Sequence, residues 1–223
     1  MKSLIIDAGH GGIDSGATAF QTKEKDWNLK MSLYQYKRLK ELGAKVALTR
    51  STDKNLTPNQ RTEKIKSKYD FCISNNFNAF NGKARGIETI HSIHAHKAFA
   101  ADIANALQKA TNLPLRRIFS RKNSLGKDWY FIHRLTGSTQ TVIIEYGFID
   151  HPDDFAYYQD DKNFNNAAEA VIQVLCQYLD IPYHKPAASV LYRVQAGAFN
   201  NIENAKHLVV KLKALGFNAF IQK

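Results

Sequence analysis

The chain has 223 residues, of which 44% are hydrophobic and 23% charged, a composition typical of a globular protein rather than a disordered or fibrous one. No apolar run approaches the roughly 18 residues that a membrane-spanning helix needs, so we expect no membrane span. The formal net charge of +11 implies an anionic partner: nucleic acid, a membrane surface or an acidic polymer. We expect no nucleic-acid partner, because no helix-turn-helix, zinc-finger or aromatic RNA-binding motif accompanies the charge.

The N-terminus and the two cysteines indicate the compartment. Only Met1, Lys2 and Ser3 precede the first predicted strand, so we expect no signal peptide and a chain made in the cytoplasm. If it works outside the cell, it leaves by another route. Cys72 and Cys176 lie in apolar runs, which favours buried free thiols over a disulfide. No CxxC spacing is present, so a thiolate zinc site is not expected.

The first predicted strand runs into a glycine-rich turn. Residues 4–8 are apolar or small except for Asp7, and Gly9, His10, Gly11 and Gly12 follow. A buried strand that ends in glycines presents a side chain at the carboxyl edge of an α/β sheet. His10 therefore either projects into a cleft as a metal ligand or forms a hydrogen bond to a neighbour.

Hydrophobic periodicity and turn residues predict the elements that follow. They are a helix from residue 24 to 42, a strand over 44–49, a helix over 60–68, a strand over 71–74, a strand over 86–91, a helix over 98–113, a basic loop over 116–128, a strand over 141–148 and a helix over 164–179. The strand–helix–strand order predicts an α/β fold with parallel, right-handed crossovers.

Several polar residues stand out on these elements. Glu145 interrupts a β-branched strand near its carboxyl end, and a buried carboxylate there needs a partner or a task. Glu24 lies at the start of a helix, where an acidic side chain interacts favourably with the helix dipole. That interaction alone would explain a glutamate at this position. His91, His94 and His96 lie close together, which is more typical of solvated surface than of a metal site.

A proline-bearing linker over residues 181–188 separates a short tail. The tail predicts a strand over 190–199, a helix over 204–215 and a strand over 217–221, a βαβ-like unit of about 35 residues that is too small to bury a good core alone. We expect it to need a second copy of the unit, a dimer mate or the main domain. Pairing through the exposed edge of its small sheet predicts a homodimer.

Taken in order, these motifs resemble the zinc-dependent N-acetylmuramoyl-L-alanine amidases of autolysins and phage endolysins. The resemblance covers residues 1–180 and rests on matching motifs at 6–12, 24–29, 61, 74–79, 86–88 and 144–149, in the same order and with similar spacing. It implies a twisted, mostly parallel sheet with helices on both faces. The tail, residues 189–223, resembles one half of a sporulation-related peptidoglycan-binding repeat domain.

The resemblance also implies a mechanism. His10 and Glu24 would ligate zinc, and Glu145 would be the acid/base that activates a zinc-bound water. The bond cut would join the lactyl group of N-acetylmuramic acid to L-alanine in peptidoglycan. The charge would hold the protein near anionic wall polymers, and the protein would act on the wall after release by a holin or cell lysis.

One residue departs from the family pattern. The family has Ser-x-His at the end of the third strand, whereas this chain has Ser74-Asn75-Asn76, and a neutral amide oxygen is a poorer zinc ligand than imidazole. Asn76 is a deliberate inactivating substitution, a natural variant that binds zinc weakly or through another group, or the mark of a wall-binding module without turnover. We hypothesise impaired zinc binding and hydrolysis, and the alternative function is a non-catalytic peptidoglycan-binding protein.

Overall fold

The structure, a computed structural model, describes residues 1–187 and 194–222. Contacts divide the chain into two units, Met1–Lys185 and Pro186–Lys223. The strands are β1 (Ser3–Ala8), β2 (Thr18–Ala19), β3 (Thr22–Lys23), β4 (Lys45–Leu48), β5 (Phe71–Asn78), β6 (Ile87–His91), β7 (Leu115–Phe119) and β8 (Gln140–Phe148). The helices are α1 (Glu24–Glu41), α2 (Pro58–Ile65), α3 (Ala98–Thr111), α4 (Phe131–Arg134), α5 (Pro152–Gln159), α6 (Asp161–Tyr178) and α7 (Ile202–Ala214).

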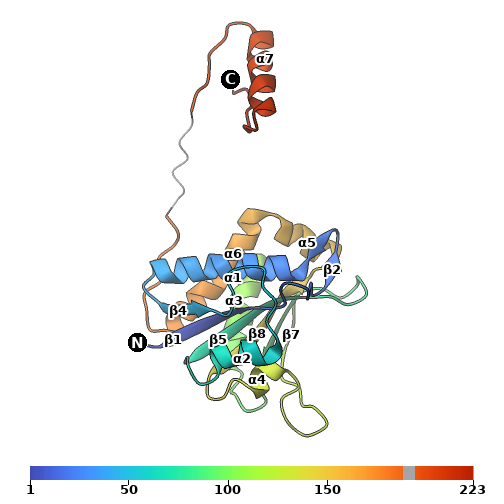
Figure 1. Cartoon of the computed structure of the whole chain (residues 1–223), viewed down its shortest axis with the longest axis vertical. Helices are drawn as coiled ribbons and strands as arrows, with labels where there is room; N and C mark the ends of the chain where they lie inside the picture. The colour runs from blue at the N-terminus through green and yellow to red at the C-terminus, as the bar shows by residue number, and fades with distance from the viewer. Residues whose placement is uncertain (188–193, 223) are drawn as a thin grey trace. The chain divides into compact units, whose positions relative to one another are not determined.

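Six strands form one sheet in the order β4-β1-β5-β8-β6-β7 (Figure 1). Every neighbouring pair is parallel except β6 and β8, which are antiparallel. This confirms the predicted α/β class with a mostly parallel sheet. β1, β5 and β8 therefore end side by side, which brings the glycine turn after β1 close to the polar ends of the other two strands.

One face of the sheet is closed by α1, α3 and α6, which pack on it over the larger hydrophobic core. Aromatic rings dominate this layer near the carboxyl ends of the strands. Phe77 on β5 lies 4.9 Å from the ring centroids of both Trp27 and Tyr158, and 5.5 Å from that of Tyr146. Alternate residues of each strand point into this core, because side chains in a strand alternate between faces.

Among the described residues, the opposite face carries only the short helices α2 and α4, which lie on the other side of the sheet in Figure 1. Its core is small and is made by six residues from the strands and these two helices: Ile5, Ile65, Cys72, Ile90, Ile132 and Ile143. Part of this face is left without a helix over it, and that part borders the site described below. The helices on both faces confirm the predicted architecture.

Two expectations were wrong. Residues 116–128, predicted as a loop, begin with most of β7, because the chain there pairs with the free edge of β6. The tail has its helix, α7, but residues 194–199 and 217–221 form no strand, and residues 190–193 lie outside the described ranges. A strand needs a neighbour to pair its backbone groups, and two strands alone are marginally stable.

Two further sequence expectations concern the cysteines and the membrane. Cys72 and Cys176 are both free and buried, as predicted. Among the described residues, no helix combines the length and the apolar character required to cross a membrane.

Candidate active site

Asp7, near the end of β1, helps to fix the conformation of the glycine turn that follows the strand. Its carboxylate is almost fully buried and accepts hydrogen bonds from Arg61 Nη1 (2.6 Å), Thr49 Oγ1 (2.7 Å) and Ser74 Oγ (2.7 Å). Arg61 also donates to the carbonyl oxygen of His10 at 3.0 Å. A buried ion pair with its remaining donors and acceptors satisfied holds the turn in one geometry.

His10 adopts a backbone φ of +57°, in the left-handed region, and Gly11 and Gly12 after it also have positive φ. This turn points the imidazole across the sheet edge. Its Nε2 lies 3.2 Å from Glu24 Oε2, and its Nδ1 lies 2.9 Å from Asp14 Oδ2. Burial alone would lower the pKa of His10, but the hydrogen bonds and charges of Glu24 and Asp14 outweigh it and raise that pKa from 6.5 to about 9.

Glu24 is the first residue of α1 and is buried. Its Oε1 accepts from Asn28 Nδ2 at 3.1 Å and from the backbone N–H of Phe77 at 3.2 Å, and its Oε2 accepts from the N–H of Ala17 at 2.9 Å. These donors fix the carboxylate beside His10. The interaction with the helix dipole is therefore not the only role of Glu24. Its carboxylate accepts hydrogen bonds from α1, from β5 and from the loop before β2.

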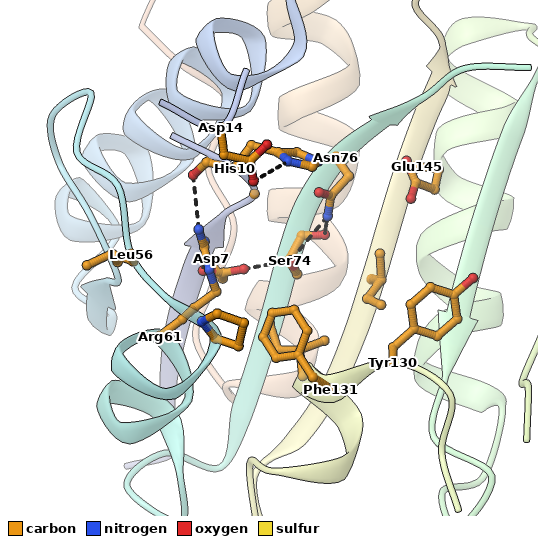
Figure 2. A pocket seen from close by; sticks show the side chains of 14 residues that line it. Asp7, His10, Asp14, Leu56, Arg61, Ser74, Asn76, Tyr130, Phe131 and Glu145 are labelled. Atoms are coloured by element: carbon orange, nitrogen blue, oxygen red, sulfur yellow. Dashed lines mark hydrogen bonds and ion pairs between the residues drawn. The ribbon is translucent and has the colours of Figure 1, made fainter. Parts of the chain in front are cut away.

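Asn76 on β5 lies between His10 and Glu145 in Figure 2. Its amide nitrogen donates to Ser74 O and Ser74 Oγ, both at 3.1 Å. A Cβ at Gly9 would come within 2.0 Å of Asn76 Oδ1, so a glycine is required at position 9. The strand register pairs Asn76 directly with Glu145 on β8, and the sequence prediction that these residues share one site is consistent with this placement.

Glu145 is partly buried, and its Oε2 atom accepts no hydrogen bond from any residue in the described ranges. Burial raises the pKa of Glu145 well above its usual range, and the negative charges of Glu24 and Glu88 act in the same direction, while His10 and Arg117 oppose them. A carboxyl group in this state exchanges a proton nearer to neutral pH than an exposed glutamate does.

These side chains surround a cavity of about 330 Å³ that extends from the carboxyl ends of the strands toward α2 and α4. His10, Asn76 and Glu145 line one side, while Arg61, Tyr130 and Phe131 line the other (Figure 2). The cavity offers polar groups at one end and aromatic groups at the other. That combination suits a small organic substrate with a polar reacting group.

The donor set fits a zinc ion in two of the three protein positions that catalytic zinc sites use. His10 and Glu24 converge and are held by neighbouring donors. The third position is Asn76, which offers a neutral amide oxygen. In the part of the chain that the structure describes, no group of three or more His, Cys, Asp or Glu side chains is arranged to hold a metal, and this applies to His91, His94 and His96 as well.

Sequence reasoning missed some of the residues that build the site. Asp14 was not singled out, although it lies four residues after His10 and bonds its imidazole. A buried network below the site was also missed, in which Asn75 donates to Gln35 Oε1 at 2.8 Å and Tyr146 donates to Asn75 Oδ1 at 2.9 Å. The only signal was polar residues at positions that the strand and helix periods place inside the core.

Comparison with known proteins gives the family. Residues 4–177 match the family model described as N-acetylmuramoyl-L-alanine amidase, and residues 188–223 match the SPOR domain. A probable cell wall amidase of Staphylococcus epidermidis, LytH, is 30% identical over 181 residues, which is 79% of this chain and 58% of that protein. The sporulation-specific N-acetylmuramoyl-L-alanine amidase of Bacillus subtilis is 26% identical over 237 residues, 99% of this chain and 84% of that protein.

A solved structure supports the same conclusion. The catalytic domain of CwlV, an N-acetylmuramoyl-L-alanine amidase from Bacillus (Paenibacillus) polymyxa var. colistinus, superposes with a TM-score of 0.73 at 30% identity. The match covers 82% of this chain and all of that domain. The family is generally zinc-dependent. By sequence and by fold, the chain belongs to the N-acetylmuramoyl-L-alanine amidase family of peptidoglycan hydrolases.

Proposed function

We propose that this chain hydrolyses the amide bond between N-acetylmuramic acid and L-alanine in peptidoglycan, with Glu145 as the acid/base. The observation that carries the proposal is the partnerless, buried Oε2 of Glu145, on a strand directly beside Asn76 and facing the same cavity as His10. A buried carboxyl oxygen without a hydrogen bond is costly, so a reacting group of the substrate is its natural partner.

His10, Glu24 and Asn76 would hold a zinc ion, with Asn76 as the weak member of the set. Zinc, when bound, lowers the pKa of water and polarises the amide carbonyl. Glu145 accepts a proton from water and returns it to the amine nitrogen that leaves, a task that its raised pKa suits. Arg61, which is ion-paired with Asp7, donates to the backbone carbonyl of His10 and holds it in place.

We propose further that Asn76 impairs zinc binding and hydrolysis. The test is zinc content per chain and release of stem peptide from sacculi, measured for the chain and for its Asn76→His variant. We expect little zinc and weak hydrolysis in the former, and about one zinc and clearly faster hydrolysis in the latter. Equal zinc content and equal hydrolysis in both proteins would contradict the role of position 76.

Two controls separate binding from chemistry. The double variant Asn76→His, Glu145→Gln should bind zinc and release no peptide, because it keeps the metal ligands and lacks the acid/base. Asn78→His places a histidine two residues along the same strand, beside Glu88 rather than between His10 and Glu145, and should restore neither zinc nor hydrolysis. If Asn78→His restores both, the site is not the one assigned.

A second candidate function is favoured by Asn76 alone: a peptidoglycan-binding protein on the amidase fold, without turnover. In that case the chain and the Asn76→His variant would both sediment with purified sacculi, and neither protein would solubilise the sacculi. Hydrolysis by the chain that carries Asn76 excludes this candidate. The positive charge of the chain would favour retention near anionic wall polymers in both cases.

For the tail we propose weak wall adhesion and pairing with a second copy. Residue matches to the SPOR domain support adhesion. Support for pairing comes from α7, of which no residue is buried, and from the exposed apolar side chains Val210, Leu215 and Phe217. Light scattering should give a dimer for the full chain and a monomer for residues 1–186. We place the action of the protein at the cell wall, and release by a holin or lysis remains part of the proposal.

A further inference from the structure

A row of polar side chains continues the site across the open face of the sheet. The strand register pairs Asn76 with Glu145, Glu145 with Glu88 on β6, and Glu88 with Arg117 on β7. The three pairs lie side by side on adjacent strands, so the row runs from the cavity to the edge of the sheet. Nothing in the proposed chemistry uses its last two members, Glu88 and Arg117.

Glu88 does not offer its charge to a ligand, because the protein already neutralises it. Its carboxylate is buried to 1% exposure and accepts from Arg117 Nε at 2.9 Å, from Asn78 Nδ2 at 3.2 Å and from Arg116. Two guanidinium groups on one carboxylate leave a net positive charge. The side chain of Arg117 is 49% exposed, so this excess charge faces solvent at the end of the row.

The segment after β7 adds to the positive charge. Residues 115–134 contain one acidic residue, Asp128, and six basic ones: Arg116, Arg117, Arg121, Lys122, Lys127 and Arg134. Asp128 is buried and accepts from Ser92 Oγ and the N–H of Ile93, and in the described part of the chain none of the six basic side chains forms a salt bridge with it. Arg116 and Arg117 together keep one uncompensated positive charge beside Glu88, and within residues 1–187 and 194–222 the other four basic side chains of the segment form no salt bridge.

Arg121 is an exposed member of this set. It stacks 3.9 Å over the ring of Trp129, which is 48% exposed, and it forms no ion pair with a carboxylate within residues 1–187 and 194–222. Tyr130, the next residue, lines the cavity with Glu145. The stack of Arg121 on Trp129 therefore lies one residue from the cavity lining.

The spacing of the row defines what it can bind. Adjacent strands are about 4.8 Å apart, so Arg117 lies two strands, or roughly 10 Å, from Glu145. An extended peptide covers about 3.3 to 3.6 Å per residue, so roughly three residues span this distance. A peptide whose first amide lies at Glu145 therefore places the side chain or terminal carboxylate of its second or third residue at Arg117.

We propose that Arg117 and Arg121 form a carboxylate-binding subsite that selects acidic stem peptides over those with amidated carboxylates. This inference rests on the proposed function, because it takes Glu145 as the position of the cleaved bond. It assigns the peptide side of the substrate to the β6–β7 edge. The two arginines bind and orient the substrate and take no part in proton transfer.

The test uses the peptide product, which lacks the cleaved bond and so reports binding without turnover. The full chain is titrated with a synthetic stem peptide that starts with L-alanine and has free carboxylates, and with the same peptide carrying amidated carboxylates. Tryptophan emission is a direct readout, because the chain has two tryptophans and Trp27 is 9% exposed against 48% for Trp129.

We expect the acidic peptide to bind about tenfold more tightly than the amidated one, the size of one charge-assisted hydrogen bond at a partly exposed site. Arg117→Gln and Arg121→Gln should each remove most of this preference and leave binding of the amidated peptide unchanged. Lys45→Gln, on β4 at the opposite edge of the sheet, removes the same charge and should change neither affinity.

If Arg117→Gln does not fold, Arg121→Gln is the variant that tests the proposal. Among the described residues Arg121 pairs with no buried carboxylate, so its replacement leaves no buried charge without a partner. Equal affinity for the two peptides, or an unchanged preference in Arg121→Gln with a folded circular dichroism spectrum, would overturn the subsite. Failure of the amidase proposal looks different: peptide binding and its arginine dependence persist while the Asn76→His variant releases nothing from sacculi.

Discussion

The two faces of the sheet are built on opposite principles. Toward α1, α3 and α6 the strands present mainly apolar and aromatic side chains that pack into one continuous core, in which Asn75 is a hydrogen-bonded polar exception. Toward α2 and α4, the same strands carry Asp7, Ser74, Asn76 and Glu145, with only a small apolar cluster behind them. The closed face supplies most of the stability. The open face holds charged and polar groups whose burial costs folding free energy, and the apolar core on the closed face offsets that cost.

Phe77 tests the closed face and should give the largest effect. Phe77→Ala removes a fully buried ring that contacts Trp27, Tyr146 and Tyr158, and should lower the free energy of unfolding by about 3 to 5 kcal/mol. Urea denaturation measures it. Phe131→Ala on the open face is the matched control and should cost less than about 2 kcal/mol, because that ring already borders a cavity. Equal losses would mean that the two faces contribute alike.

Arg61 tests the buried ion pair that holds the open face. Arg61→Ala leaves the carboxylate of Asp7 buried without its cation, and should lower the free energy of unfolding by about 3 kcal/mol. Thr49 and Ser74 still donate to Asp7, which places the expected loss at the lower end for such pairs. In the Asn76→His background, zinc content should fall as well. Retained zinc with lost stability would show that the His10 turn holds without Arg61.

The pH dependence of zinc binding tests the raised pKa of His10. In the metal-free protein His10 keeps its proton up to about pH 9, and zinc must displace it. Zinc affinity of the Asn76→His variant should therefore rise with pH, by about tenfold per unit between pH 7 and 9. Competition with a zinc indicator measures this slope. Asp14→Asn removes one group that raises the pKa of His10, and should make the slope shallower.

The same group gives a stability prediction of opposite sign. Because the folded pKa of His10 lies above its unfolded value of 6.5, its contribution to stability is complete below pH 6.5 and is lost as pH rises toward 9. Metal-free protein should thus lose some stability over the range in which zinc binding improves. An increase in the stability of metal-free protein from pH 7 to 9, absent in Asp14→Asn, would contradict this assignment.

Thr57 should give the smallest effect. It caps α2 on the open face, where its hydroxyl accepts from the N–H of Gln60 and the Gln60 side chain accepts from the N–H of Thr57. Thr57→Ala should lower the free energy of unfolding by about 1 kcal/mol, visible as a small drop in Tm. Thr57→Ser keeps the hydroxyl and should remain near the original Tm. A loss in Thr57→Ser equal to that in Thr57→Ala would exclude the cap as the cause.

The amino-acid order predicts most of the larger unit because its signals are local. A β-branched run and a glycine after a helical pattern act through neighbouring residues, so β8 and α1 lie close to the predicted bounds, whereas α2 begins two residues and ends three residues earlier than predicted. β7 and the last strand of the tail were predicted wrongly because a strand depends on its partner. Residues 115–119 acquire one from β6, and residues 217–221 have none in the described part of the chain.

The sequence determined the fold class, the family motifs and the substitution at Asn76, since each of these is carried by residue types at short spacings. Only the tertiary structure decided that Glu24, 14 positions after His10, lies 3.2 Å from its imidazole, and that Glu145 lies beside Asn76. The strand register in the folded protein also places Glu88 beside Glu145, and Arg117 beside Glu88. Such contacts join strands and helices distant in sequence, and only packing of the sheet against its helices sets those distances.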